Sequence, residues 1–189
     1  MVQVLTLPGW QGSGPGHWQS RWERRHGYLR VEQHDWQRPL RGDWTARLQD
    51  VVLAQPQPVV LAAHSLGCLL AAWWAAHSGA VDRVAGALLV APPDIEREDL
   101  RQAIPGWAPP ARQRLPFRTV VVASSDDPFG ALDSAARLAQ DWGATFYNLG
   151  PHGHINADSG LGDWDEGHAL LRALVAAASA PTGTTGARA

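Results

Sequence analysis

The sequence contains no lysine, and its 16 Lys-or-Arg positions are all arginine. This absence excludes every mechanism that needs a lysine amine, such as a Schiff base. Only one cysteine is present, Cys68, so no intramolecular disulfide can form. The net charge is −2, so the sequence lacks the excess of positive charge that binds nucleic acid or an anionic membrane surface. We therefore expect neither of these as a partner.

Long hydrophobic runs are also missing, and the apolar stretches are too short for a membrane span. The first residues, 1–7, lack the basic start and the apolar core of a signal peptide. A cytoplasmic location is therefore the default expectation. The length suits one domain with a single core, which we place at residues 1–178. We expect residues 179–189, rich in Ala, Thr, Gly and Pro, to form a disordered tail.

Short apolar runs alternate with helical patterns along the chain. Strands are expected at 3–7, 28–33, 58–63, 84–90, 119–123 and 145–149, and helices at 17–25, 43–53, 68–76, 131–142 and 166–178. Asp43 is the expected N-cap of the second helix. Residues 95–117 are expected to be irregular, with at most one short helix and no large lid. The alternation predicts an α/β fold with about six mostly parallel strands and helices on both faces.

Ser65 lies where a buried strand turns sharply into an apolar helix. Ala63 and Gly67 flank it at two residues on either side. Small flanking residues suit the nucleophile elbow of an α/β-hydrolase, because strand and helix cross closely at that turn. The pattern of this superfamily usually begins with Gly rather than Ala. The pentapeptide by itself is therefore only a weak signal.

An acid and a histidine follow Ser65 in the order that this fold requires. Asp127 comes just after the strand at 119–123, and His154 comes after the strand at 145–149. All three residues stand at carboxyl ends of expected parallel strands, the edge where ligand sites of such sheets lie. This agreement predicts a Ser65–His154–Asp127 triad.

Neighbouring residues leave alternatives open. Asp126 could replace Asp127, but we interpret it as a turn residue that bonds its own backbone. His152 is interpreted as a loop residue, and His64 as structural. A metal site at His152, His154 and Asp158 is the less favoured interpretation, because no second half of such a site is recognisable elsewhere in the sequence.

The chain resembles the YdeN-like family of small serine hydrolases, a group that also contains the retinoblastoma-binding hydrolase of animals. The resemblance extends up to the final helix and rests on Leu7-Pro8-Gly9-Trp10, Gly12-Ser13-Gly14-Pro15, His17-Trp18-Gln19-Ser20-Arg21-Trp22-Glu23, Ala63-His64-Ser65-Leu66-Gly67, Ser125-Asp126-Asp127-Pro128-Phe129, Trp142-Gly143-Ala144 and Gly153-His154-Ile155-Asn156. It implies a compact α/β-hydrolase without a lid domain, with Ser65, Asp127 and His154 as its triad. Members of the group commonly have Ala at the position of Ala63.

An acyl-transfer mechanism on Ser65 also needs backbone N–H donors for the developing oxyanion. We expect these from Leu66, directly after the nucleophile, and from Trp10, in the loop after the first strand. Trp10 and Trp107 are the expected pocket residues, and Trp164 is a weaker candidate. The short segment 95–117 leaves little cover for a long acyl chain.

The leading hypothesis is a serine hydrolase that cleaves small, mainly apolar esters or thioesters, or amides. It needs no cofactor and no metal. The alternative from another class is a protein-binding module on a hydrolase scaffold, although no motif supports a protein partner. Acyl transfer or perhydrolysis on the same triad is a third option that the sequence does not separate from hydrolysis.

Overall fold

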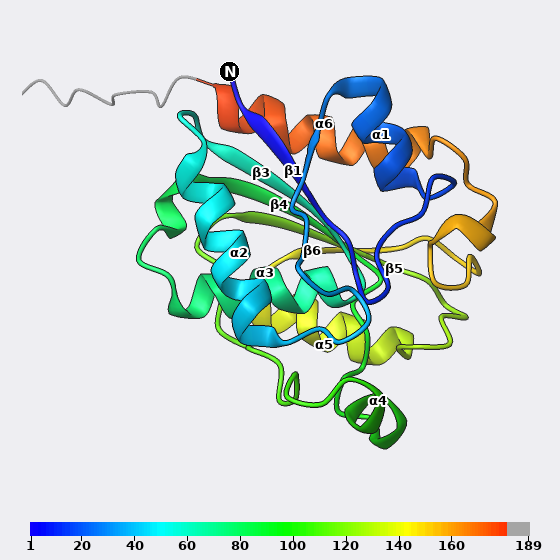
Figure 1. The fold of residues 1–189 in the computed structure, drawn as a ribbon. Helices are drawn as coiled ribbons and strands as arrows, with labels where there is room; N and C mark the ends of the chain where they lie inside the picture. Colours follow the sequence, from blue (N-terminus) through cyan, green and yellow to red (C-terminus); the bar gives the residue numbers. More distant parts are fainter. Residues whose placement is uncertain (181–189) are drawn as a thin grey trace, which may run out of the picture.

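Six strands form one sheet at the centre of the molecule (Figure 1). The computed structural model describes residues 1–180. The strands are β1 (Gln3–Leu7), β2 (Leu29–Arg30), β3 (Val59–His64), β4 (Val84–Val90), β5 (Arg118–Ala123) and β6 (Thr145–Asn148). Their order is β2-β1-β3-β4-β5-β6, and each neighbouring pair is parallel. The strand order reverses at β1 and β3, and doubly wound sheets bind ligands at the carboxyl edge of that point.

Helices cover both faces of the sheet (Figure 1). They are α1 (Trp18–His26), α2 (Arg41–Ala54), α3 (Leu66–His77), α4 (Glu98–Ala103), α5 (Leu132–Trp142) and α6 (Asp165–Ser179), with short 3-10 turns at Val81–Arg83 and Ala157–Ser159. Helices α1 and α6 lie on one face, and α2, α3 and α5 lie on the other. Helix α4 lies at the rim, beyond the carboxyl ends of the strands.

The central strand β3 shows why the sheet needs two cores. Its residues are all buried, and they alternate between the two faces. Leu61 and Ala63 pack against α2, α3 and α5, whereas Val60 and Ala62 pack against α1 and α6. A strand that is buried on both faces reads as a continuous apolar run, which is the pattern that the sequence shows at this place.

Two sequence predictions about the amino-terminal half are wrong. The second strand has only two residues, because the pairing with β1 covers only Leu29 and Arg30. Asp43 is not an N-cap, since α2 begins at Arg41 with Leu40 as its cap residue. Asp43 lies instead in the first turn, where a carboxylate interacts favourably with the helix dipole.

The carboxyl-terminal helix extends slightly beyond its expected end. Helix α6 runs to Ser179, one residue past the boundary placed at 178. Residues 181–189 of the expected disordered tail lie outside the described residues. Among the helices of residues 1–180, none has the length and apolarity needed to cross a bilayer.

Candidate active site

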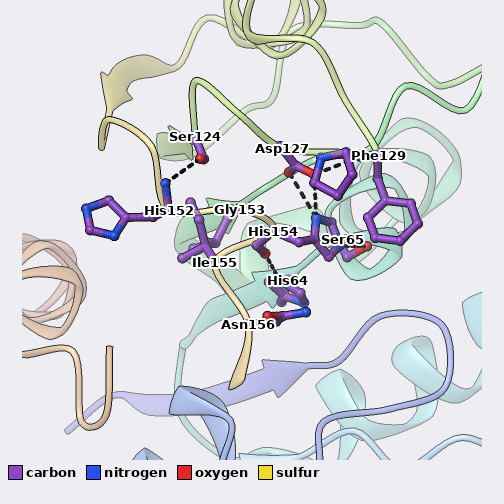
Figure 2. Close-up of polar contacts among 12 residues, drawn as sticks. His64, Ser65, Ser124, Asp127, Phe129, His152, Gly153, His154, Ile155 and Asn156 are labelled. Carbon is purple, nitrogen blue, oxygen red and sulfur yellow. Dashed lines mark hydrogen bonds and ion pairs between the residues drawn. The ribbon is translucent and has the colours of Figure 1, made fainter. Parts of the chain in front are cut away.

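The carboxyl edge of the sheet brings together three residues that are far apart in the sequence (Figure 2). Ser65 follows β3, Asp127 follows β5 and His154 follows β6. The Nε2 atom of His154 lies 2.9 Å from Ser65 Oγ, and its Nδ1 atom lies 2.9 Å from each Asp127 carboxylate oxygen. Because a carboxylate only accepts, Nδ1 carries the proton in this arrangement, and Nε2 is left to accept from the serine hydroxyl.

Ser65 sits in a strained backbone conformation, with φ 55° and ψ −123°. Its own amide donates to Val90 O at 2.9 Å, and its carbonyl accepts from Cys68 N–H at 2.9 Å. Gly67 is required because a Cβ there would collide with the carbonyl oxygen of Leu7. The sharp turn thus raises the hydroxyl above the sheet edge, as a nucleophile elbow does.

The loop after β1 lies directly against this turn. A Cβ on Gly9 would lie only 2.7 Å from Ser65 Cβ and 3.2 Å from Leu66 N. Trp10 and Leu66 both line the cavity around Ser65. Within residues 1–180, neither of their amide N–H groups has a hydrogen-bond acceptor. Both groups are thus available to a ligand oxygen.

The cavity over Ser65 has a volume of about 340 Å³. Its walls combine apolar side chains from the rim with small or polar residues from the loops after β1 and β6. The apolar part consists of Trp10, Leu66, Pro93, Leu100, Ile104 and Phe129. Leu100 and Ile104 come from α4 and its C-cap, one turn apart. Sequence reasoning missed these two residues, although their spacing of four was a helical signal.

Trp107 is placed elsewhere, and the expectation that it lines the pocket has to be corrected. Its side chain is only 1% exposed, and its indole N–H donates to Pro39 O at 2.7 Å. The ring packs edge to face on Trp44 of α2, and both residues belong to the larger of the two core clusters. Trp164 is not on the cavity either, because it packs against Trp18 and Trp22 on the opposite face.

The acid loop and the base loop are tied together beside the triad. Asp126 does not face His154; its Oδ1 atom accepts from the hydroxyl of Ser124 and from Gly153 N–H. These hydrogen bonds, that from Ser124 first, lower the pKa of Asp126. The amide of His152 donates to Ser124 Oγ at 2.9 Å. His152 is a loop residue, as the sequence interpretation proposed. Asp126 was expected to bond the backbone of its own turn, but it bonds Ser124 and the base loop at Gly153 instead.

The structure does not assemble the metal site considered from the sequence. Asp127 occupies the Nδ1 side of His154, and Ser65 occupies the Nε2 side. Across residues 1–180, no group of three or more His, Cys, Asp or Glu side chains is arranged to hold a metal ion. The chemistry available here is therefore that of a hydroxyl, an imidazole and a carboxylate.

Two further histidines lie under the triad. The Nε2 atom of His64 lies 2.8 Å from the carbonyl oxygen of His154, and burial holds the pKa of His64 well below its usual value. His17 caps α1 by accepting from Gln19 N–H, and its ring packs edge-on against His64. Burial, with a contribution from nearby His154, lowers the pKa of His17 to about 3. Both histidines are thus neutral at physiological pH. No sequence signal identified His17 as part of the cavity wall.

The chain matches known proteins along almost its whole length. A serine hydrolase family model matches residues 4–173. A putative YdeN-like hydrolase from Pectobacterium atrosepticum is 30% identical, with a TM-score of 0.81, and the match covers 94% of this chain and 92% of that one. The ydeN gene product of B. subtilis is 20% identical, with a TM-score of 0.75, and the match covers 93% and 100% of the two chains.

More distant structures share the fold. A thermophilic esterase from Thermogutta terrifontis is 15% identical, with a TM-score of 0.64 over 95% of this chain and 91% of that one. Among curated proteins, no significant match was found. The family match and the 30% identical structure agree with the resemblance in the sequence motifs. The chain is thus a member of the serine hydrolase family, with an α/β-hydrolase fold and YdeN-like hydrolases among its structural neighbours.

Proposed function

We propose that the protein hydrolyses esters or thioesters with short, mainly apolar acyl groups, through an acyl-enzyme formed on Ser65. The observation that carries this proposal is the continuous hydrogen-bonded path from Ser65 Oγ through His154 to Asp127, which opens into the cavity. A serine hydroxyl is a weak nucleophile unless a positioned base accepts its proton. His154 is at the distance that this transfer needs.

The first half of the reaction forms the acyl-enzyme. Ser65 Oγ bonds to the acyl carbon as its proton passes to His154 Nε2, and Asp127 stabilises the imidazolium that results. The carbonyl electrons move onto oxygen, where the N–H groups of Trp10 and Leu66 stabilise the negative charge. The tetrahedral species then collapses, and the leaving oxygen or sulfur takes the proton from His154.

Water completes the cycle by the same steps in reverse. His154 accepts a proton from the attacking water molecule, whose oxygen bonds to the acyl carbon. The bond to Ser65 Oγ then breaks, and the serine recovers its proton from His154. The product is a carboxylic acid. Amides would follow the same route, with a poorer leaving group.

The shape of the cavity supports the choice of substrate. A volume of about 340 Å³ is near the lower end for small-molecule sites, so it suits a short acyl chain. Trp10, Leu100 and Ile104 provide apolar walls. Helix α4 has six residues and does not form a larger cover over the site. Long acyl chains would project into solvent and gain little binding energy from their outer methylenes.

Labelling with a fluorophosphonate probe tests the proposal most directly, with wild type beside Ser65→Ala and His154→Ala. We expect wild type to be labelled and both variants to remain unlabelled, since the probe reacts with an activated serine. The same three proteins are then assayed on a p-nitrophenyl ester with a short acyl group. If Ser65→Ala retains most of the esterase activity, the proposal is wrong. A folded wild type that neither labels nor turns over would favour the protein-binding alternative.

A further inference from the structure

The base loop, residues 149–156, presents His154 without support from a strand or a long helix. Ile155, directly after the base, has a φ of 48°, in the left-handed region. A β-branched side chain rarely adopts this region, because its Cβ crowds the neighbouring peptide groups. Such a conformation persists only where surrounding groups hold it in place. The loop therefore needs restraints at this point.

Two buried side chains hold the peptide groups on either side of Ile155. His64 Nε2 lies 2.8 Å from the carbonyl oxygen of His154, and Trp18 Nε1 donates to the carbonyl oxygen of Ile155 at 2.9 Å. A carbonyl only accepts, so His64 donates from Nε2. The first carbonyl belongs to the peptide group that defines φ of Ile155, and the second to the group that defines ψ. Figure 2 shows His64 next to the backbone carbonyl of His154. The two imidazole rings also pack edge to face, at 4.8 Å between centroids.

We propose that His64 and Trp18 are positioning residues, a base-loop clamp whose two N–H groups hold Ile155 in its left-handed conformation and thereby set His154 against Ser65. This inference rests on the proposed function, since it assigns a role toward the same base. Within residues 1–180, neither clamp residue forms a hydrogen bond with Ser65 Oγ or with the ring nitrogens of His154, although the His64 ring packs edge-on against the ring of His154. The two N–H groups act through the backbone at His154 and Ile155.

The surroundings of His64 suit a permanent N–H donor. Its side chain is 5% exposed, and the ring of His17 covers it edge-on at 4.6 Å between centroids. Burial lowers the pKa of His64 and keeps the ring neutral, so the ring carries one N–H, which the contact with the His154 carbonyl places on Nε2. His64 also directly precedes Ser65. One hydrogen bond therefore links the end of the nucleophile strand to the loop that carries the base, 90 residues further along the chain.

The clamp complements restraints on the other side of the loop. Ser124 and Asp126 accept from the N–H groups of His152 and Gly153, before the base. The clamp holds the carbonyls of His154 and Ile155, at and after the base. Peptide groups are thus held on both sides of His154. Displacements of about 1 Å at a catalytic group can lower turnover by about a hundredfold, so such restraints matter for rate.

The first test compares His64→Met with His64→Gln. Met fills a similar volume without an N–H group, whereas the side-chain amide of Gln can place an N–H near the position of Nε2. We expect His64→Met to lower kcat on a short p-nitrophenyl ester by about ten- to a hundredfold while KM changes little. His64→Gln should recover most of this loss. Equal kcat values for wild type and His64→Met would contradict the clamp.

The second test compares Trp18→Phe with Trp142→Phe as a matched control. Trp142 is also fully buried, and its indole N–H donates to Ala111 O at 2.8 Å, on the other face of the sheet. Both variants lose one buried indole hydrogen bond, so both should lose stability to a similar degree. We expect only Trp18→Phe to lower kcat, by about tenfold or more. Equal effects on kcat would show a general structural role and overturn the proposal.

An NMR signal of His154 tests the clamp independently of catalytic activity. The Nδ1 proton of His154, bonded to Asp127, should give a low-field imidazole signal in the proton NMR spectrum. Loss of the clamp should shift or broaden that signal in His64→Met and Trp18→Phe but not in Trp142→Phe. If wild type proves inactive, the proposed function fails, and this signal still decides the clamp. An unchanged signal in both clamp variants would overturn it.

Discussion

Single atoms decide whether the nucleophile turn can form. Gly67 has no room for a Cβ against the Leu7 carbonyl, and Gly9 has almost none against Ser65 and Leu66. The glycines are thus required by close approach of two backbones, and neither has a positive φ. Gly67 belongs to the elbow, and Gly9 belongs to the loop that contributes Trp10 to the proposed oxyanion hole.

Gly9→Ala should therefore damage the site more than a glycine substitution elsewhere in the same loop. Its new Cβ would push the loop away from Ser65 and displace the Trp10 N–H. We expect kcat/KM on a short ester to fall by about a hundredfold, the typical loss for one oxyanion donor. Gly16→Ala is the matched control, because Gly16 is not among the cavity residues and a Cβ there would meet only Ala157 Cβ, at an ordinary 3.7 Å. Similar losses in the two variants would contradict this account of the loop.

The two adjacent acids differ in what they face. Asp127 contacts the ring of His154, whereas Asp126 accepts from Ser124 and Gly153. Asp127→Asn would favour the wrong tautomer of His154, so we expect kcat to fall by about a thousandfold or more. Asp126→Asn keeps an acceptor oxygen for the loop and should lose less than about tenfold in kcat. Steady-state kinetics with both variants checks this order, and the reverse order would reassign the acid.

At the scale of elements, α4 and its C-cap give the site part of its apolar wall. Leu100 and Ile104 are buried and line the cavity, although the helix itself has only six residues. The sequence predicted no large lid and at most one short helix in this segment. The structure has such a helix at the rim, and it limits the room above Ser65. We infer that this element sets the acyl length that the enzyme accepts.

Leu100→Trp should narrow the cavity and shift the substrate preference. We expect kcat/KM for p-nitrophenyl hexanoate to fall at least about tenfold relative to the acetate, because binding energy from several methylenes is lost. Leu53→Trp is the control, since Leu53 is an exposed residue on α2. A parallel decrease for both esters would argue that Leu100 affects folding rather than the pocket.

Trp107 lies in the same segment as α4, residues 95–117, but has a different role. Because it is buried against Trp44, Trp107→Ala should lower the free energy of unfolding by about 3–5 kcal/mol. The preference between short and longer esters should stay unchanged. Urea denaturation and a series of acyl chain lengths measure the two quantities. A changed preference without a loss of stability would restore Trp107 to the pocket.

At the scale of the whole molecule, the buried histidines make stability depend on pH. The folded state holds the pKa of His17 at about 3 and that of His64 well below its usual value, whereas the unfolded chain takes up these protons near pH 6.5. The unfolded state therefore binds more protons below pH 6.5, and stability falls as the pH decreases. Each histidine contributes up to about 1.4 kcal/mol per pH unit in this range.

His17→Asn isolates one part of this dependence. Asn can keep the cap of α1 by accepting from Gln19 N–H, but it does not titrate. Between pH 6.5 and 5, we expect its free energy of unfolding to fall by about 1 kcal/mol per pH unit less than that of wild type. Urea denaturation at several pH values measures the slopes. His34→Asn, at an exposed histidine, is the control and should keep the wild-type slope.

Local patterns in the sequence predicted much of this protein. The alternation of apolar runs and helical segments, and the elbow around Ser65, depend on neighbours within a few residues. The sequence order of Ser65, Asp127 and His154 predicted their meeting, because parallel strands all end at one edge of the sheet. The predicted edge strand was longer than the observed β2. The length of this strand depends on its pairing with β1 rather than on its own residues.

Long-range packing settled the rest of the site. Whether Trp107 faces the cavity or the core depends on the path of its loop across α2, which no local pattern encodes. The contacts of Trp18 and His64 with the base loop span 137 and 90 residues. A single sequence does not show that a side-chain N–H will bond a distant backbone carbonyl, because neither group leaves a distinctive pattern in its own segment. Such pairs become visible only when the folded chain brings them within hydrogen-bonding distance.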